Sequence, residues 1–185
     1  MTIVLLSGKA QHGKDTCGQY IADMLKEHSK RVLIAHYGDL VKYICTQFFG
    51  WDGKKDEAGR AMLQRVGTDV IRKQYPDYWV NFLLELFRLF KDEWDYVIIP
   101  DVRFENEVDL FKDSEFDTIH LRVLRTDFES PLTIEQQHHP SETALDHVVP
   151  DKWIYNMGTL EELSERAIDA FCCVMDTIAL SQQKN

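Results

Sequence analysis

The chain has 185 residues, a formal net charge of -10 and 44% apolar residues. This composition is typical of an ordinary globular chain, and we expect a single domain over residues 1–185. The negative charge argues against a nucleic-acid polymer as partner, because phosphate backbones attract basic surfaces, while a small nucleotide can still bind in a local positive pocket.

Apolar runs in the sequence are too short for a signal peptide or a membrane span. The four cysteines show no Cys-x-x-Cys spacing, which is typical of free thiols in a reducing compartment. We therefore predict a cytoplasmic protein without a membrane partner.

The first predicted element is a buried strand over residues 2–6, followed by a loop bounded by Gly8 and Gly13 and then by a helix. Strand, glycine-bounded loop and helix form the setting of a phosphate-binding loop. The glycines allow successive N–H groups to point at one anion, and the helix adds unpaired N–H donors and the positive end of its dipole. Lys14 supplies a positive charge for the β- and γ-phosphates. The alternative is a glycine-rich turn that holds no ligand.

The residues after this lysine depart from the common phosphate-loop pattern, in which Ser or Thr follows and binds Mg²⁺. Here Asp15 follows Lys14, and Thr16 comes next. Phosphates would repel a bare carboxylate, so Asp15 either holds a cation such as Mg²⁺ between itself and the phosphates or turns aside to cap the helix.

A second buried strand is predicted over residues 31–37, and a helix with an apolar face follows it. Because ligands bind beyond the carboxyl ends of parallel strands, Asp39 and Lys42 fall where a second substrate could sit. The alternatives are a helix N-cap for Asp39 and a solvated face for Lys42.

The middle of the chain is predicted to be helical over residues 60–72, with an interruption at Gly67 and Thr68. Such a glycine often marks a helix end or a close backbone approach to a ligand. Asp77 can cap the next helix, whose apolar face is predicted to be core.

Another buried strand, over residues 95–101, ends on the carboxylate of Asp101. A phosphate-loop enzyme needs a second acid near Mg²⁺ at the end of the strand beside the loop, and Asp101 is the best candidate. Arg103 follows in the same crevice, where its planar guanidinium suits a pair of phosphate oxygens. The alternative for Arg103 is an ion pair with Glu107.

After a strand predicted over residues 118–124, a polar segment bounded by prolines has little core of its own. It is a candidate lid over the phosphates, with Arg125 at its root. His138, Glu142 and nearby polar residues do not match a standard zinc spacing, so we expect a helical turn with solvated polar groups.

The last strand is predicted to end at Asn156, and the turn that follows it could cradle the purine of ATP. Thr159 and Glu162 have the spacing of a capping box for a final amphipathic helix.

Four motifs together resemble the phage-type deoxynucleoside monophosphate kinases, a family within the P-loop nucleoside monophosphate kinases. They are Gly13-Lys14-Asp15-Thr16, Leu63-Gln64-x-x-Gly67-Thr68-Asp69-x-x-Arg72, Asp101-Val102-Arg103-Phe104-x-Asn106-Glu107 and Ser141-Glu142-x-x-Leu145-Asp146. The resemblance runs from the first strand to the last, and the Lys-Asp-Thr ending is usual in this group.

The resemblance implies a three-layer α/β/α fold with a central parallel sheet of about five strands. It also implies a helical acceptor-binding region at about 39–90 and a short lid at about 125–146. The activity implied is transfer of the γ-phosphoryl group of ATP to a deoxynucleoside monophosphate, with Mg²⁺ as cofactor. The location would be the host cytoplasm if the chain is viral, and a homodimer is compatible with the sequence.

The resemblance also assigns residues by position. The donor phosphates and Mg²⁺ are assigned to Gly13, Lys14, Asp15 and Thr16. The loop and strand pattern described above adds Gly8 to the phosphate site and Asp101 as a metal-positioning acid. The acceptor site is assigned to Asp39, Lys42, Gln64, Arg72, Trp79 and Arg103. Arg125 would be the lid arginine, and Asn156 and Gly158 would lie near adenine. Lys14, Arg103, Arg125 and Asp101 are the expected catalytic residues.

Two other functions are compatible with a phosphate-binding loop. One is a P-loop kinase of another phosphorylated metabolite, of the dephospho-CoA or phosphomevalonate type. The other is a nucleotide-binding module without an acceptor, although the Asn-Lys-x-Asp run expected of a guanine-specific switch is not in the sequence. ADP release measured with a panel of acceptors separates these functions.

Overall fold

The structure, a computed structural model, describes residues 1–126 and 128–182. Asp127, inside the expected lid, and residues 183–185 of the expected domain lie outside the described residues. The elements, in chain order, are β1 (Thr2–Ser7), α1 (Lys14–Glu27), β2 (Val32–Ile34), α2 (Tyr37–Phe49), α3 (Glu57–Gln64), the π-helix η1 (Arg65–Arg72), α4 (Tyr78–Leu89), β3 (Tyr96–Val102), α5 (Glu105–Lys112), β4 (Asp117–Leu124), α6 (Ile134–Gln137), α7 (Pro140–Thr143), β5 (Lys152–Tyr155) and α8 (Leu160–Gln182).

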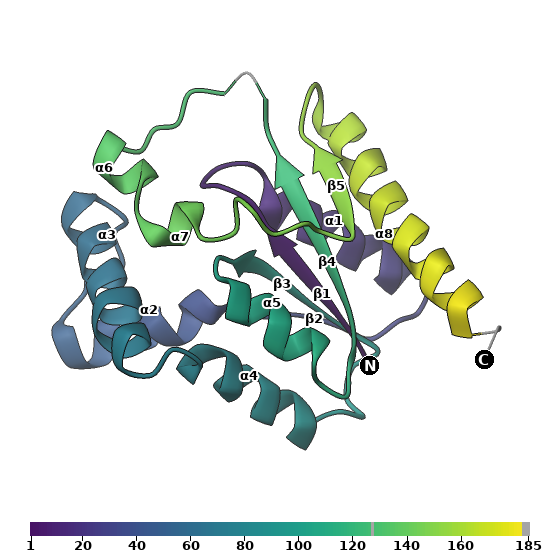
Figure 1. The fold of residues 1–185 in the computed structure, drawn as a ribbon, viewed down its shortest axis with the longest axis horizontal. Helices are drawn as coiled ribbons and strands as arrows, with labels where there is room; N and C mark the ends of the chain where they lie inside the picture. Colours follow the sequence, from purple (N-terminus) through teal and green to yellow (C-terminus); the bar gives the residue numbers. More distant parts are fainter. Residues whose placement is uncertain (127, 183–185) are drawn as a thin grey trace.

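The strands form a five-stranded sheet in the order β2-β3-β1-β4-β5 (Figure 1). Every pairing is parallel. β1 lies at the centre between β3 and β4, so the loop that follows it leaves the middle of the sheet at its carboxyl edge. The predicted parallel sheet is confirmed.

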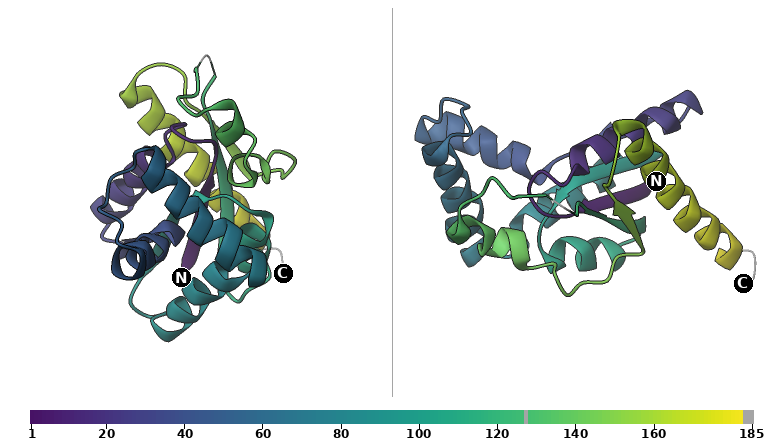
Figure 2. Two further views of the ribbon diagram at one scale, coloured as in Figure 1. Left: turned by 90° about the vertical axis from the view of Figure 1, so that its left-hand side faces the viewer. Right: turned by 90° about the horizontal axis from the view of Figure 1, so that it is seen from above.

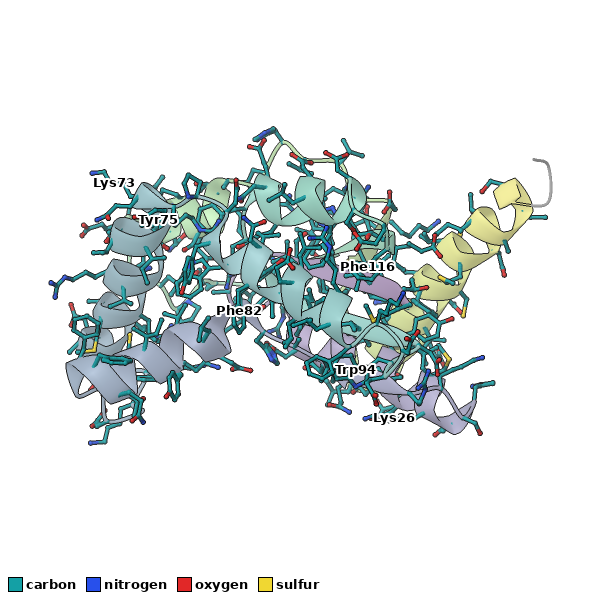
Figure 3. All side chains as sticks on the ribbon, turned by 90° about the horizontal axis from the view of Figure 1, so that it is seen from below. Lys26, Lys73, Tyr75, Phe82, Trp94 and Phe116 are labelled. Carbon is teal, nitrogen blue, oxygen red and sulfur yellow. The ribbon has the colours of Figure 1, made fainter. Side chains whose placement is uncertain are left out.

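Helices cover both faces of this sheet because successive strand residues point to opposite sides. Val4 and Leu6 belong to the core shared with α1 and α8, whereas Ile3 and Leu5 belong to the core shared with α4 and α5. Figure 3 shows the α4 layer from below, with Phe82 labelled on that helix. The predicted three-layer α/β/α architecture is therefore confirmed.

The predicted strands are present with shifted ends. The strand expected over residues 31–37 is reduced to β2, because α2 already begins at Tyr37. The strand expected over residues 95–101 runs one residue further, to Val102. Both shifts lie at the carboxyl edge of the sheet, where the chain turns toward the candidate site.

The predicted interruption at Gly67 and Thr68 is wrong, because α3 continues directly into η1. A Cβ atom on Gly67 would lie 3.3 Å from both Cγ atoms of Val41, so glycine lets α2 pack closely against η1. The carbonyl oxygen of Gly67 accepts a hydrogen bond from Nε1 of Trp79 at 2.9 Å. This glycine allows a close approach between helices and does not end the helix.

The predicted helix caps have different outcomes. Asp77 is the N-cap residue of α4, as predicted, but its Oδ1 accepts a hydrogen bond from Nδ2 of Asn106 at 2.7 Å and does not bond to the amides of the helix. Asp39 lies inside the first turn of α2 and is not its N-cap. The capping box of α8 is confirmed, because Glu162 N donates to Thr159 Oγ1 at 3.2 Å and Thr159 N donates to Glu162 Oε2 at 3.3 Å.

The α2, α3 and η1 helices form an arm at the end of the molecule opposite the last turns of α8 (Figure 2). The α6 and α7 helices lie beside this arm in all three ribbon views (Figures 1 and 2). The predicted acceptor-binding and lid segments are therefore neighbours in space.

All four cysteines lie within the described residues and are free thiols, as predicted. Within residues 1–126 and 128–182, helices long and apolar enough to cross a membrane are absent.

Candidate active site

The loop after β1 has the backbone shape of an anion cradle. Gly8, Gln11 and Gly13 have positive φ angles of 142°, 60° and 99°. Gly13 is the N-cap of α1, and within the described part of the chain this end of the helix has no side-chain cap. The first amides of α1 are therefore available to an anion.

The side chain of Lys14 is buried under this loop, and its Nζ donates to the carbonyl oxygen of Lys9 at 2.9 Å. Burial and the nearby Arg103 guanidinium lower the pKa of Lys14 to about 7. A polyphosphate in the loop would favour the charged form of Lys14, because a nearby anion raises the pKa of an amine.

We expect Gly8→Ala to disrupt the loop. A Cβ atom on Gly8 would lie 2.4 Å from the carbonyl oxygen of Val123, and the φ of 142° is strained for any L side chain. The variant should lose about 1–3 kcal/mol of unfolding free energy and most of its ATP affinity, measured by urea denaturation and calorimetry.

Gly50→Ala is the matched control for this substitution. Gly50 also has a positive φ, of 68°, but a Cβ atom there would meet nothing within 4 Å. The Gly50→Ala variant should lose about 1 kcal/mol of unfolding free energy through backbone strain alone, and its ATP affinity should be unchanged. Equal ATP affinity in the Gly8→Ala variant and the wild type would contradict the role of this loop.

The segment after β5 holds the loop from the opposite side. Nδ2 of Asn156 donates to the carbonyl oxygen of His12 at 3.0 Å, and a Cβ atom on Gly13 would lie 2.9 Å from that same Nδ2. Gly158 follows with a φ of 110°. Asn156 therefore supports the phosphate loop directly, while a position of Asn156 and Gly158 near adenine stays a prediction.

Asp15 does not cap α1. Its carboxylate is 78% exposed, and its Oδ1 lies 3.2 Å from Nε2 of His36. The ring of His36 also lies 3.5 Å from the carboxylate of Asp39. The hydrogen bond between Asp15 and His36 lowers the pKa of the carboxyl and raises the pKa of the imidazole. Thr16, the next residue along α1, is half-buried.

Asp101 connects the sheet to α2. Its two carboxylate oxygens accept hydrogen bonds from the backbone N–H groups of Tyr37 at 3.1 Å and Gly38 at 2.8 Å. Burial raises the pKa of Asp101, although these two N–H groups and the nearby His36 ring oppose the shift. Asp101 thus supplies the N-terminal cap of α2, a role that the strand pattern did not indicate.

A cavity of about 590 Å³ extends from the phosphate loop to the α2–η1 arm. The predicted site residues that line it are Lys14, Asp15, Lys42, Gln64, Arg72, Trp79, Asp101 and Arg103. Six basic side chains face this cavity, from Lys14, Lys42, Lys55, Arg60, Arg72 and Arg103, against three acidic ones. The cavity is therefore a positive pocket on an acidic protein.

The predicted site residues outside the cavity lining are Gly8, Gly13, Thr16, Asp39, Arg125, Asn156 and Gly158. Asp39 contacts the lining indirectly, because its Oδ1 accepts a hydrogen bond from Nζ of Lys42 at 2.7 Å. Lys42 therefore faces the cavity and pairs with Asp39, while its side chain is 38% exposed.

Arg72 is fixed in the cavity wall by three groups. Its guanidinium forms an ion pair with the buried carboxylate of Glu107, donates to Oδ1 of Asn106 at 3.1 Å, and lies 3.9 Å from the centre of the Phe104 ring. Burial raises the pKa of Glu107 to about 7, while the Arg72 guanidinium and backbone N–H groups oppose the shift. These three contacts hold one face of the Arg72 guanidinium toward the cavity.

Arg103 does not form the expected alternative ion pair with Glu107. Nη1 of Arg103 lies 2.6 Å from Oε1 of Glu142, and only the backbone N of Arg103 donates to Glu107, at 2.6 Å. Glu142 is 8% exposed, so the expectation that its segment carries solvated polar groups is wrong for this residue.

Arg125 lies at the root of the expected lid, beside the phosphate loop. Its backbone N donates to Nδ1 of His12 at 3.2 Å, and its guanidinium lies 4.5 Å from the centre of the Phe128 ring. The ring of Phe128 in turn meets the ring of His12 edge-on, with centroids 6.0 Å apart. His12 therefore joins the loop to the first residues of the lid.

Sequence reasoning missed three functional candidates in this region: His36, Glu107 and Glu142. Glu107 and Glu142 lie inside the motifs that carry the family resemblance. Their position in those motifs was the signal that could have indicated a functional role. His36 lies just after β2, at the carboxyl edge of the sheet, and is the N-cap residue of α2. Its position beyond a parallel strand is the same signal that indicated Asp39.

Solved structures share this fold. Dephospho-CoA kinase from Campylobacter jejuni aligns with a TM-score of 0.53 and 10% identity, over 91% of this chain and 95% of that chain. Shikimate kinase from Aquifex aeolicus aligns with a TM-score of 0.50 and 14% identity, over 97% of this chain and 99% of that chain. Identities this low show the fold alone. The sheet order, the glycine-bounded loop and the buried lysine define the P-loop kinase fold.

The family described as deoxynucleotide monophosphate kinase matches residues 37–167. The chain belongs to the deoxynucleotide monophosphate kinase family, and it is an enzyme that transfers a phosphoryl group to a nucleotide. A protein of Acanthamoeba polyphaga mimivirus, provisionally given this name, is 29% identical over 195 residues, which cover 91% of this chain and 95% of that protein. The deoxynucleotide monophosphate kinase of Enterobacteria phage T4 is 35% identical over 106 residues, which cover 56% of this chain and 41% of that protein.

Proposed function

We propose that the protein transfers the γ-phosphoryl group of ATP to a deoxynucleoside monophosphate bound in the 590 Å³ cavity. The observation that carries this proposal is the shared cavity, in which Lys14 of the phosphate loop and Arg72 of the η1 helix line one space. Two phosphate-binding groups on different elements suit a donor and an acceptor side by side. The names of the family and of the viral relatives support the deoxynucleotide as acceptor.

We assign the donor to the loop and the acceptor to the arm. Gly8, Gly13 and Lys14 would hold the phosphates of ATP, with Asn156 and Gly158 toward adenine. The acceptor would lie in the region of residues 39–90, where Arg72 is held by Glu107 and suits a phosphate oxygen pair. The flat indole of Trp79 and the amide of Gln64 line the same space and would contact the nucleoside, with Lys42 and Asp39 at the start of α2.

The residues at the start of α1 fit a magnesium ion that comes with the nucleotide. Mg²⁺ prefers oxygen ligands and usually keeps several waters and phosphate oxygens. Asp15 offers an exposed carboxylate and Thr16 a hydroxyl, while Asp101 could orient a bound water. Within residues 1–126 and 128–182, clusters of three or more His, Cys, Asp or Glu side chains with metal-binding geometry are absent. When bound, Mg²⁺ would neutralise charge on the β- and γ-phosphates.

Transfer in such a site needs no nucleophilic side chain, because alignment and neutralisation of spread charge supply most of the catalysis. Lys14 and Arg103 would contact the moving phosphoryl group from the loop side and from β3. Arg125 would reach it from the lid at residues 125–146. The part of this lid that carries Arg125 would close over the phosphates, exclude water and so suppress hydrolysis of ATP.

The test is ADP release with ATP, Mg²⁺ and each common deoxynucleoside and ribonucleoside monophosphate in turn. We expect at least one deoxynucleoside monophosphate to raise ADP release about tenfold or more above the rate with ATP alone. Stimulation by dephospho-CoA or phosphomevalonate but by no nucleotide would contradict the proposed acceptor. ATP binding without stimulation by any acceptor would identify a nucleotide-binding module instead.

A further inference from the structure

The carboxylate of Glu142 binds two groups that commonly bind phosphate. Its Oε2 accepts a hydrogen bond at 2.8 Å from the backbone N–H of Ala10, inside the phosphate loop, and its Oε1 lies 2.6 Å from Nη1 of Arg103. An amide of a phosphate loop and an arginine facing it are typical ligands of two oxygens of one phosphate. Here the two oxygens belong to an internal carboxylate.

The Ala10 amide has no second hydrogen to offer a phosphate. A backbone amide has a single N–H, and Ala10 already donates it to Oε2 of Glu142. Ala10, Arg103 and Ser141 also line the 590 Å³ cavity, so a phosphate in that cavity can reach this place. A phosphate that binds the Ala10 amide must therefore displace this carboxylate.

The segment that carries Glu142 is attached to the loop by further polar contacts. Nη1 of Arg103 also donates to the carbonyl oxygen of Ser141 at 3.2 Å, and Nζ of Lys9 lies 3.4 Å from a carboxylate oxygen of Asp146. The Lys9–Asp146 ion pair is partly exposed and individually weak. The chain after α7 is anchored apart from Glu142, because Leu145 is buried in the core and Arg122 lies 2.7 Å from the carboxylate of Asp146. Within α7, the contacts with the loop and with Arg103 come from Glu142 and Ser141, so an anion that competes for them would separate α7 from the loop while Leu145 stays in the core.

We propose that Glu142 is a further residue of the transfer site, whose carboxylate holds the Ala10 amide and Arg103 until a phosphate of ATP displaces it. This inference rests on the proposed function, because it assigns Arg103 and the loop to ATP. It makes docking of α7 and binding of the triphosphate mutually exclusive. In the enzyme without ATP, Arg103 is therefore paired with Glu142, and it pairs with the phosphates once ATP binds.

The test compares ATP and ADP binding to the wild type and to Glu142→Gln by calorimetry, with Mg²⁺ and no acceptor. A neutral amide pairs with arginine more weakly than a carboxylate and does not repel phosphates. We expect the dissociation constant for ATP to fall about tenfold in the variant, with a smaller change for ADP. Glu135→Gln, in the exposed α6 helix of the same segment, is the matched control and should bind ATP as the wild type does.

A second measurement uses the wild type alone, in case the variant does not fold. Hydrogen exchange of α7, at Pro140–Thr143, should become faster when ATP binds, because α7 loses its contact with the loop. Unchanged or weaker ATP binding by Glu142→Gln, or slower exchange of this segment with ATP, would overturn the inference and make Glu142 a permanent partner of Arg103. ATP binding is read without any acceptor, so failure of transfer to nucleotides would not be confused with failure of this inference.

Discussion

Replacing Lys14 with methionine is expected to reduce phosphoryl transfer by about 10³-fold or more, because the preorganised charge next to the moving phosphoryl group is lost. The side chain is buried under the loop, and methionine has a similar length, so the loop itself should persist. The measurement is ADP release at saturating ATP and acceptor.

The same substitution should raise the melting temperature. Burial lowers the pKa of Lys14 to about 7, so the folded state binds fewer protons than the unfolded state between that value and the ordinary lysine pKa. The cost of burying the charged Lys14 side chain therefore lowers the free energy of unfolding most at and below neutral pH. Methionine carries no charge, so the substitution removes this cost. Lys26→Met, at the exposed last turn of α1, is the control and should change neither quantity. Unchanged turnover in the Lys14→Met variant would remove this lysine from the mechanism.

Replacing Glu107 with alanine is expected to cost about 3–5 kcal/mol of unfolding free energy, because it leaves the charge of Arg72 without its buried partner. The change also removes the acceptor of the backbone N–H groups of Arg103 and Phe104. Urea denaturation followed by circular dichroism measures this loss. Glu105→Ala, in the same turn of α5 but half-exposed, should cost about 0.5 kcal/mol or less.

Glu107→Gln separates structure from acceptor binding. The amide oxygen can still accept the backbone hydrogen bonds, but the side chain no longer carries the charge that holds the Arg72 guanidinium in the cavity wall. We expect the KM for the acceptor to rise about tenfold while the KM for ATP stays unchanged. An equal rise in both KM values would contradict the assignment of Arg72 to the acceptor.

The layers of the fold could be predicted because local signals determine them. The β-branched run before Gly8 and the apolar strand before Asp101 are buried on both faces, and such runs separated by helices favour a parallel sheet. The phosphate loop could be predicted for the same reason, since the positions of Gly8, Gly13 and Lys14 along the chain already fix its geometry.

The partners of the site residues could not be predicted, because they depend on contacts between distant segments. The carboxylate of Asp101 binds amides more than sixty positions earlier, and Glu142 binds an amide that is 132 positions away. The continuous helix at Gly67 depends on Val41 in the same way, because only the packing of α2 explains why glycine is tolerated there. Local propensity predicted a break, and tertiary packing overrode it.

The support that Asn156 gives to the backbone of His12 has a consequence for how the enzyme is made. A ribosome synthesises this loop more than a hundred residues before the side chain that supports it. The chain should therefore become able to bind nucleotide only late in translation, after β5 has paired with the edge of the sheet. A fragment that stops short of this strand would carry the whole loop sequence and still bind ATP poorly.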